Sequence, residues 1–268
     1  PHVPHLQGTS AGRASFPERL RDNRIRDGLS TGISGPGLRL RLNNFLFQAQ
    51  LCQGMSGRYL VLSDVHRREW VASAARELLK EHSLDAVVLL GDITHFGPPQ
   101  FAEEFIRDLG TTCYAVPGNC DPLGTEDYIK RAGTSLHGVK MTIDGRTWGG
   151  LGGSNPTIFN TPFEMTEEEI SRLLGPVMEP GMVLVLHNPA RGTFDTTFSG
   201  RHVGSTAAAQ AIERCKPLVV LSGHIHEDRG VTDKNGVWYM NPGAAKDHYA
   251  GMMELDGSVR LTLLDLPS

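Results

Sequence analysis

The chain has 268 residues, of which 39% are hydrophobic and 21% charged, and its formal net charge is −4. This length and composition are typical of a globular protein with a sizeable core, and the small negative charge gives no electrostatic basis for a nucleic-acid partner. The sequence has no apolar run near the roughly 18 residues that cross a bilayer. Its four cysteines form no CxxC pair, which indicates free thiols in a reducing compartment. We therefore expect a soluble, cytoplasmic protein without a membrane partner, of open oligomeric state.

The first part of the chain differs from the rest in composition. Residues 1–54 contain seven arginines, no lysine and no methionine, and are interrupted by glycine and serine. We expect a partly disordered extension here, in which only residues 41–52 are apolar enough to pack. The first methionine is Met55, which favours a native start at that residue; an Arg-rich targeting peptide is the alternative. The folded domain is then predicted to span 55–268.

Short apolar strands alternate with amphipathic helices after Met55. Strands are predicted at residues 59–64, 86–92 and 113–119. Helices are predicted between them at residues 69–82 and 99–110. In the first helix the apolar residues fall on one face: Val71, Ala74, Ala75, Leu78 and Leu79. A β-α-β-α-β beginning of this kind builds a parallel sheet with helices on its faces.

The second half of the domain is richer in strands. They are predicted at residues 139–144, 147–153, 182–188, 218–224, 237–243, 251–255 and 259–264. Helices are predicted near residues 166–175 and 205–215. Thr166 and Glu169 have the spacing of a capping box at the start of the first of these helices. The elements together predict a single α/β domain with two sheets and outer helices.

Five predicted strands end in polar residues of one chemical kind. The segments are Asp64-Val-His66, Gly91-Asp92, Gly118-Asn119-Cys120-Asp121, His187-Asn188 and Gly223-His224-Ile225-His226. Open α/β sheets place their ligands at the carboxyl ends of strands, and carboxylate, imidazole and amide oxygen suit Mn²⁺, Fe or Zn²⁺. Each segment alone is also explained by a helix cap, a turn or a buried histidine. The five in this order favour a metal site.

These segments resemble the calcineurin-like metallophosphoesterase superfamily, whose pattern is DxH, GD, GNH[DE], H and GHxH. The sequence is similar above all to a prokaryotic, mainly archaeal group of predicted phosphoesterases, through GDITHFGP, PGNCD and GHIHEDRG. The resemblance implies a four-layer αββα sandwich of two mixed sheets flanked by helices. It also implies two divalent ions, with Mn²⁺ favoured and Fe, Ni²⁺ or Zn²⁺ as alternatives.

The ligand sets also follow from this resemblance. The first ion would be held by Asp64, His66, Asp92 and His226. The second would be held by Asp92 as a bridge, Asn119, His187 and His224. Such a pair of ions clamps phosphate oxygens and lowers the pKa of a bridging water until it is hydroxide near neutral pH. A small phosphoester is therefore the expected substrate.

Cys120 departs from the family pattern, in which a histidine resembles a general acid at this position. A thiol has a reference pKa of about 8.5 against about 6.5 for imidazole, so it is poorly matched as a proton donor. Members that carry GNCD look like phosphodiesterases, which favours hydrolysis of small phosphodiesters, with Asp92, Asn119, Cys120 and Asp121 as catalytic residues and Asp121 also structural in the turn. Cys120 as a space-filling residue, a nucleophile or a redox-sensitive thiol are the alternatives.

Four further residues are candidates for binding the substrate phosphate: His95, Arg191, Arg201 and His202. Each is also explained as a surface charge or a hydrogen bond at a strand end. The competing functions are a phosphomonoesterase or protein phosphatase, a nuclease, and a non-catalytic interaction scaffold of the same fold. The scaffold predicts missing ligands, whereas every expected ligand is present in this sequence.

Overall fold

A computed structural model describes residues 56–268, and the predictions for residues 1–54, including the packing of 41–52, lie outside this range. The described part forms five α-helices, one short 3-10 helix and twelve strands. None of its helices combines the length and the apolar composition that a bilayer crossing needs.

The first sheet has six strands and mixed directions. Its order is β12 (Val259–Asp265), β11 (Tyr249–Asp256), β1 (Ser56–Leu62), β2 (Ala86–Leu89), β3 (Thr112–Ala115) and β4 (Thr134–Ser135). Strands β1 to β4 are parallel, whereas β11 is antiparallel to both β1 and β12. The parallel strands therefore end at one common edge.

The second sheet also has six strands. Its order is β5 (Lys140–Ile143), β6 (Arg146–Leu151), β7 (Val183–Leu186), β8 (Val219–Leu221), β10 (Val237–Asn241) and β9 (Gly230–Lys234). Strands β6, β7, β8 and β10 are parallel, and the two outer strands pair antiparallel to their neighbours. Both sheets are thus mixed, as the resemblance implied.

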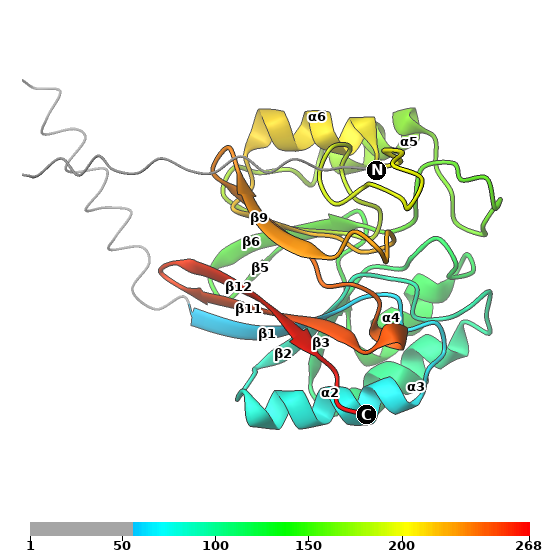
Figure 1. Ribbon diagram of the computed structural model, residues 1–268, viewed down its shortest axis with the longest axis vertical. Coiled ribbons are helices and arrows are strands. Elements are labelled where there is room, and N and C mark those ends of the chain that lie inside the picture. The colour runs from blue at the N-terminus through cyan, green and yellow to red at the C-terminus, as the bar shows by residue number, and fades with distance from the viewer. Residues whose placement is uncertain (1–55) are drawn as a thin grey trace, which may run out of the picture. The chain divides into compact units, whose positions relative to one another are not determined.

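Helices cover the outer face of each sheet (Figure 1). The first sheet carries α2 (Trp70–Glu81), α3 (Gln100–Leu109) and α4 (Thr125–Ala132), and the second carries α5 (Glu167–Leu174) and α6 (Thr206–Cys215). A third apolar cluster fills the space between the sheets. The predicted four-layer αββα sandwich is therefore confirmed. The 3-10 helix η1 (Ala245–Asp247) lies between β10 and β11 in the chain.

The alternation of side chains along β1 shows how one strand serves two cores. Tyr59 and Val61 face the second sheet, whereas Leu60 and Leu62 face the helices on the other side. All four are buried, which explains why the strand reads as a continuous apolar run. Tyr59 packs against the fully buried Trp148 with 5.0 Å between ring centroids.

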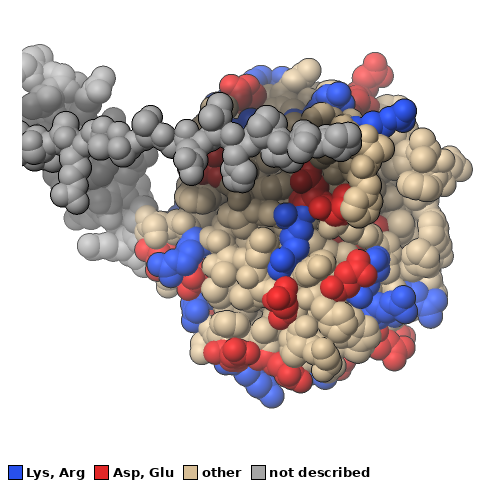
Figure 2. Space-filling model, viewed as in Figure 1, with Lys and Arg blue, Asp and Glu red and all other residues tan. Residues whose placement is uncertain are grey.

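Most predicted elements are present, and three short ones had not been predicted. The capping box at α5 is confirmed, since Thr166 Oγ1 accepts the Glu169 N–H and the Glu169 carboxylate accepts the Thr166 N–H. The elements missed are α4, β4 and β9. Helix α4 buries only two side chains, β4 has two residues, and β9 has no fully buried residue, so none carries a strong hydrophobic pattern. On the face shown in Figure 2, acidic and basic side chains are interspersed.

Candidate metal centre

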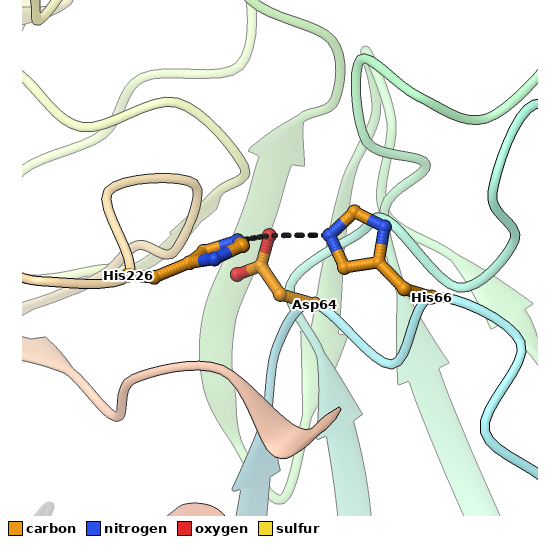
Figure 3. A group of neighbouring side chains, drawn as sticks. All are labelled: Asp64, His66 and His226. Carbon is orange, nitrogen blue, oxygen red and sulfur yellow. Dashed lines mark ion pairs between the residues drawn. The ribbon is translucent and has the colours of Figure 1, made fainter. Parts of the chain in front are cut away.

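Side chains from both sheets converge where the parallel strands end. Asp64 follows β1, and its Oδ1 lies 3.0 Å from His226 Nε2 and 3.8 Å from His66 Nε2. Figure 3 shows the carboxylate between the two imidazoles. Because the other oxygen, Oδ2, accepts the Ser63 hydroxyl at 2.6 Å and the His224 N–H at 3.1 Å, Oδ1 is held toward the two rings.

Asp92, which follows β2, joins this group to a second one. Its Oδ2 lies 3.6 Å from His66 Nε2, and its Oδ1 lies 3.4 Å from His187 Nε2. His187 Nε2 is in turn 2.7 Å from Asn119 Oδ1. The Asp92 carboxylate therefore lies between two groups of candidate metal ligands, one with His66 and the other with His187. A ligand that bridges two ions needs this position.

The side-chain atoms that converge here do not satisfy one another by hydrogen bonds, whereas divalent ions would bind them. Asp64 Oδ1 and His66 Nε2 are buried and accept no hydrogen bond of regular geometry among the described residues, although His226 Nε2 lies 3.0 Å from Asp64 Oδ1. His187 Nδ1 donates to the Leu90 carbonyl, and in the neutral ring Nε2 then carries a lone pair that faces the Asn119 carbonyl oxygen. Two acceptors at this distance repel each other unless a cation lies against both. Metal ions with oxygen and imidazole ligands, one on each side of Asp92, would satisfy these four atoms.

The orientation of the Asn119 amide is fixed by a chain of hydrogen bonds that the sequence had not indicated. Asn119 Nδ2 donates to Thr161 Oγ1 at 3.0 Å, and Thr161 Oγ1 donates to Glu164 Oε1 at 2.7 Å. The hydroxyl proton is thus engaged by the carboxylate, and the amide must present its NH₂ to Thr161 and its oxygen to His187. Such outer contacts orient metal ligands. The only sequence signal was the polar loop that contains these residues.

Burial and the neighbouring charges act differently on the two carboxyl groups. Burial alone would raise the pKa of Asp64, but the imidazoles of His226, His187 and His66 hold it below its usual range. Burial, assisted by the charge of Asp64, raises the pKa of Asp92 to about 7. A like pair of buried carboxyl groups disfavours double ionisation, which is relieved when cations bind between them.

Two of the histidines around these carboxylates are held in the neutral form. Burial lowers the pKa of His66 to about 4 and that of His224 to about 3, so both rings are neutral at pH 7. Burial works against protonation of His226 as well, but the adjacent Asp64 outweighs it and raises the pKa. His224 packs against His187 with 5.0 Å between ring centroids, which brings it to the second group. Neutral imidazole is the form that binds metal.

The backbone at the centre is held in an uncommon conformation. Four of the predicted ligands are non-glycine residues with positive φ: Asp64, His66, Asp92 and His224. Such conformations cost free energy and gather at functional sites. The backbone also approaches neighbouring residues closely at the centre. A Cβ on Gly118 would collide with Asp92, and one on Gly223 would collide with Ser63. The glycines of the GNCD and GHIH segments are therefore required by space.

Asp121 holds two of the loops together rather than facing the donors. Its fully buried carboxylate accepts the backbone N–H groups of Gly118 at 2.7 Å, Thr94 at 2.7 Å and Ile93 at 3.2 Å. Burial raises the pKa of Asp121, although these three N–H groups act in the opposite direction. This contact links the loop after β2 to the loop after β3, the structural role expected for the residue.

The Cys120 side chain lies at the centre. Cys120 had been predicted as a catalytic residue but not as a metal ligand. Its Sγ, with His66 and Asp92, forms one of the groups whose ligand atoms lie within 4.8 Å of one another. Its backbone N–H donates to Asp92 Oδ1 at 2.8 Å. Burial, followed by the charge of Asp92, raises the pKa of the thiol, so that without a cation it stays protonated.

The four predicted substrate contacts are placed differently. His95 is at the centre, with Nδ1 3.1 Å from His66 Nδ1. His202 is further along the chain and pairs with the buried Asp195 at 2.7 Å. Arg201 is exposed, and Arg191 donates to the His202 carbonyl. Arg191 also lines a cavity of about 510 Å³ beside α6 whose walls contain none of the predicted metal ligands. This cavity is therefore separate from the metal centre.

Known proteins share this sequence pattern and this fold. Residues 58–259 match the calcineurin-like phosphoesterase superfamily domain. The uncharacterized protein MJ1162 of Methanocaldococcus jannaschii is 32% identical over 190 residues, which cover 68% of this chain and 85% of that protein. The crystal structure of TT1561 of Thermus thermophilus aligns with a TM-score of 0.60 at 16% identity and covers 79% of this chain and 99% of its own.

Another crystal structure aligns with a TM-score of 0.68 at 17% identity, over 80% of this chain and all of its own. At such identities the structural likeness concerns the fold alone, while the sequence match extends over most of the two-sheet domain. The chain belongs to the calcineurin-like phosphoesterase superfamily.

Proposed function

We propose that the protein is a metal-dependent phosphodiesterase that hydrolyses small phosphodiesters at a centre of two divalent ions, with Mn²⁺ favoured. The observation that carries the proposal is the position of Asp92. Its two carboxylate oxygens face His66 on one side and His187 on the other, at 3.6 and 3.4 Å. One buried carboxylate between two donor groups is the arrangement that two neighbouring ions require.

Each side chain then has a definite task. Asp64, His66 and His226 would hold one ion, and Asn119, His187 and His224 the other, with Asp92 shared between them. The bound ions would supply positive charge for the phosphate oxygens and activate water at neutral pH. The protein contributes a buried, pre-oriented set of ligands, so little reorganisation is needed when the substrate arrives.

Cys120 bears on the choice between diester and monoester substrates. Its thiol is buried and stays protonated in the absence of a cation, and no imidazole stands at this position of the sequence. An exposed imidazole is nearby, since His95 contacts His66. We infer that turnover is fast for esters with good leaving groups and slow for leaving groups that must be protonated. Cys120→Ala separates a catalytic thiol from a space-filling one, because only the first loses activity.

The test compares an aryl phosphodiester with the matching aryl phosphomonoester. Both are incubated with the wild type in Mn²⁺ or with a chelator, while bound metal is counted by mass spectrometry. Asp92→Asn should abolish diester hydrolysis and lower the metal content, whereas Asp127→Asn on the exposed face of α4 serves as the matched control.

The possible results separate the competing functions. Diester hydrolysis that needs metal and disappears in Asp92→Asn supports the proposal. Faster hydrolysis of the monoester favours the phosphomonoesterase. A protein that neither binds a divalent ion nor hydrolyses either ester contradicts the proposal and favours the interaction scaffold.

A further inference from the structure

Large apolar side chains are exposed on the loops at the carboxyl ends of the strands. Of seven exposed large hydrophobic residues in the described part of the chain, five project from these loops. We call these five residues the apolar rim: Phe96, Leu123, Ile158, Phe159 and Phe198. Exposed fractions reach 93% for Ile158 and 92% for Phe198. Single exposed apolar residues need no explanation, but a concentration around one site is typical of a binding surface.

Two members of the rim follow the metal-binding segments of the first sheet directly. Phe96 donates its backbone N–H to the Cys120 carbonyl at 3.0 Å, and its ring packs against His95, 4.8 Å between centroids. His95 in turn contacts the predicted ligand His66. Leu123 comes two residues after Asp121 and is 72% exposed. Both side chains are thus tied to the centre by short stretches of backbone.

Two more members, Ile158 and Phe159, stand on the loop of residues 155–163, at the right-hand edge of Figure 1. The base of this loop is fixed to the centre, because the Asn119 carbonyl accepts the N–H of Phe163 at 3.0 Å. Directly after the loop, Glu164 Oε1 accepts the hydroxyl of Thr157 at 2.6 Å. The exposed side chains are therefore carried by a loop with internal hydrogen bonds and a firm anchor beside a metal ligand.

The last member, Phe198, stands on a turn of the segment 190–205, which is bonded to the residues after His226. Phe198 donates its N–H to the Glu227 carboxylate at 2.9 Å, and Thr196 donates its N–H to the Asp228 carboxylate at 2.7 Å. The turn itself is closed by the Gly200 N–H on the Thr197 carbonyl at 2.7 Å. Phe198 is thus attached to the segment that follows β8 of the second sheet.

These positions limit what can lie in front of the metal centre. When a phosphate group is bound there, each ester substituent has to leave the centre past the surrounding loops. Those loops present phenyl, isoleucine and leucine side chains to solvent, and Figure 2 shows uncharged surface over much of that edge. An apolar substituent would bury this surface and gain about 25 cal/mol for each Å² removed from water. A small or charged substituent would leave it exposed.

We propose that the apolar rim binds a bulky apolar substituent of the phosphodiester substrate. This inference rests on the proposed phosphodiesterase function and names the substrate class for that site. The rim is formed by loops from both sheets, so the substituent lies across the mouth of the centre. Long alkyl and aromatic groups share the required chemistry, and the experiment distinguishes them.

The experiment uses three p-nitrophenyl phosphodiesters whose second substituent is methyl, decyl or 2-naphthylmethyl. The leaving group is the same in all three, so differences in kcat/KM report on the second substituent. For the wild type we expect kcat/KM at least about tenfold higher with one or both large substituents than with methyl. The higher value identifies an alkyl or an aromatic preference.

Phe159→Ser and Phe198→Ser should each remove most of this preference and leave hydrolysis of the methyl diester unchanged. Val139→Ser is the matched control, because Val139 is exposed beside the outer strand β5. The inference would be overturned if the wild type had equal kcat/KM for all three diesters. It would also be overturned if Phe159→Ser and Phe198→Ser lost as much activity on the methyl diester as on the large ones. A third result against the inference would be a wild-type dimer in sedimentation velocity and a monomeric Phe159→Ser, because the rim would then bind a second copy of the chain.

Failure of the proposed function is recognised separately. If the wild type hydrolyses none of the diesters with any metal, binding of decyl methyl phosphate is measured by titration calorimetry. Weaker binding to Phe159→Ser than to the wild type would support the rim by itself, and equal binding or no binding would refute it.

Discussion

The carboxylate of Asp121 gives the sharpest test of how the loops at the metal centre are held. It accepts three backbone N–H groups, from Gly118, Thr94 and Ile93, in a fully buried place. Asp121→Ala would leave all three donors without an acceptor. Each buried donor left unpaired costs about 1 to 3 kcal/mol. Since neighbouring contributions are not additive, we expect a total loss of about 3 to 6 kcal/mol.

This loss is large against the whole stability of a domain, which is about 5 to 15 kcal/mol. With about 2 to 4 °C per kcal/mol for a domain of this size, the Tm should fall by about 6 to 24 °C. The measurement is thermal and urea unfolding in the presence of a chelator, so that metal binding does not contribute. Asp121→Asn keeps one acceptor oxygen and should fall between the wild type and Asp121→Ala.

The control is Asp127→Ala, which removes an exposed carboxylate from the first turn of α4 and should cost about 1 kcal/mol or less. A loss below about 1 kcal/mol for Asp121→Ala would refute the reasoning, because the three N–H groups would then have found other acceptors.

Three further predictions concern the surroundings of the centre. Gly118→Ala drives a methyl group into Asp92 and should weaken Mn²⁺ binding about 10- to 100-fold in a calorimetric titration; unchanged affinity would contradict the steric argument. Thr161→Val removes the hydroxyl that orients Asn119 and should weaken Mn²⁺ binding about tenfold, whereas Thr161→Ser should not. Burial lowers the pKa of His137 in the folded state. As the pH falls through about 6.5, His137 is therefore protonated in the unfolded chain while it stays neutral in the folded protein. Below that pH the wild type should lose up to about 1.4 kcal/mol per pH unit relative to His137→Gln in urea unfolding, and parallel pH profiles would contradict this.

Much of the fold was predictable because its strands are buried on both faces. The runs at β1, β2, β7 and β8 are mainly apolar, and a polar residue follows within three positions of the end of each strand. Parallel strands of one sheet put those ends at one edge, so the convergence of Asp64 and Asp92 follows from the order of the elements, whereas His187 reaches them from the second sheet.

The remaining features depend on contacts that have no periodic signal. Helix α4 and strand β9 bury too few residues to show a pattern, and the Glu164–Thr161–Asn119 chain of hydrogen bonds depends on how one loop folds back. The separation of Arg191 from the metal centre has the same origin. Arg191 comes four residues after the candidate ligand His187, but its guanidinium donates to the His202 carbonyl, and side-chain direction in an irregular segment cannot be read from a sequence.

The donors of the metal centre are divided between the two halves of the molecule. Asp64, Asp92 and Asn119 come from the sheet that contains β1, and His187 and His226 come from the sheet that contains β7. A bound ion would therefore act as a cross-link between two layers, in addition to the apolar packing that joins them. In the metal-loaded protein the sheets could then separate only if the ion were released. Amide hydrogens in the region between the sheets should therefore exchange with solvent faster in a chelated sample than in a loaded one.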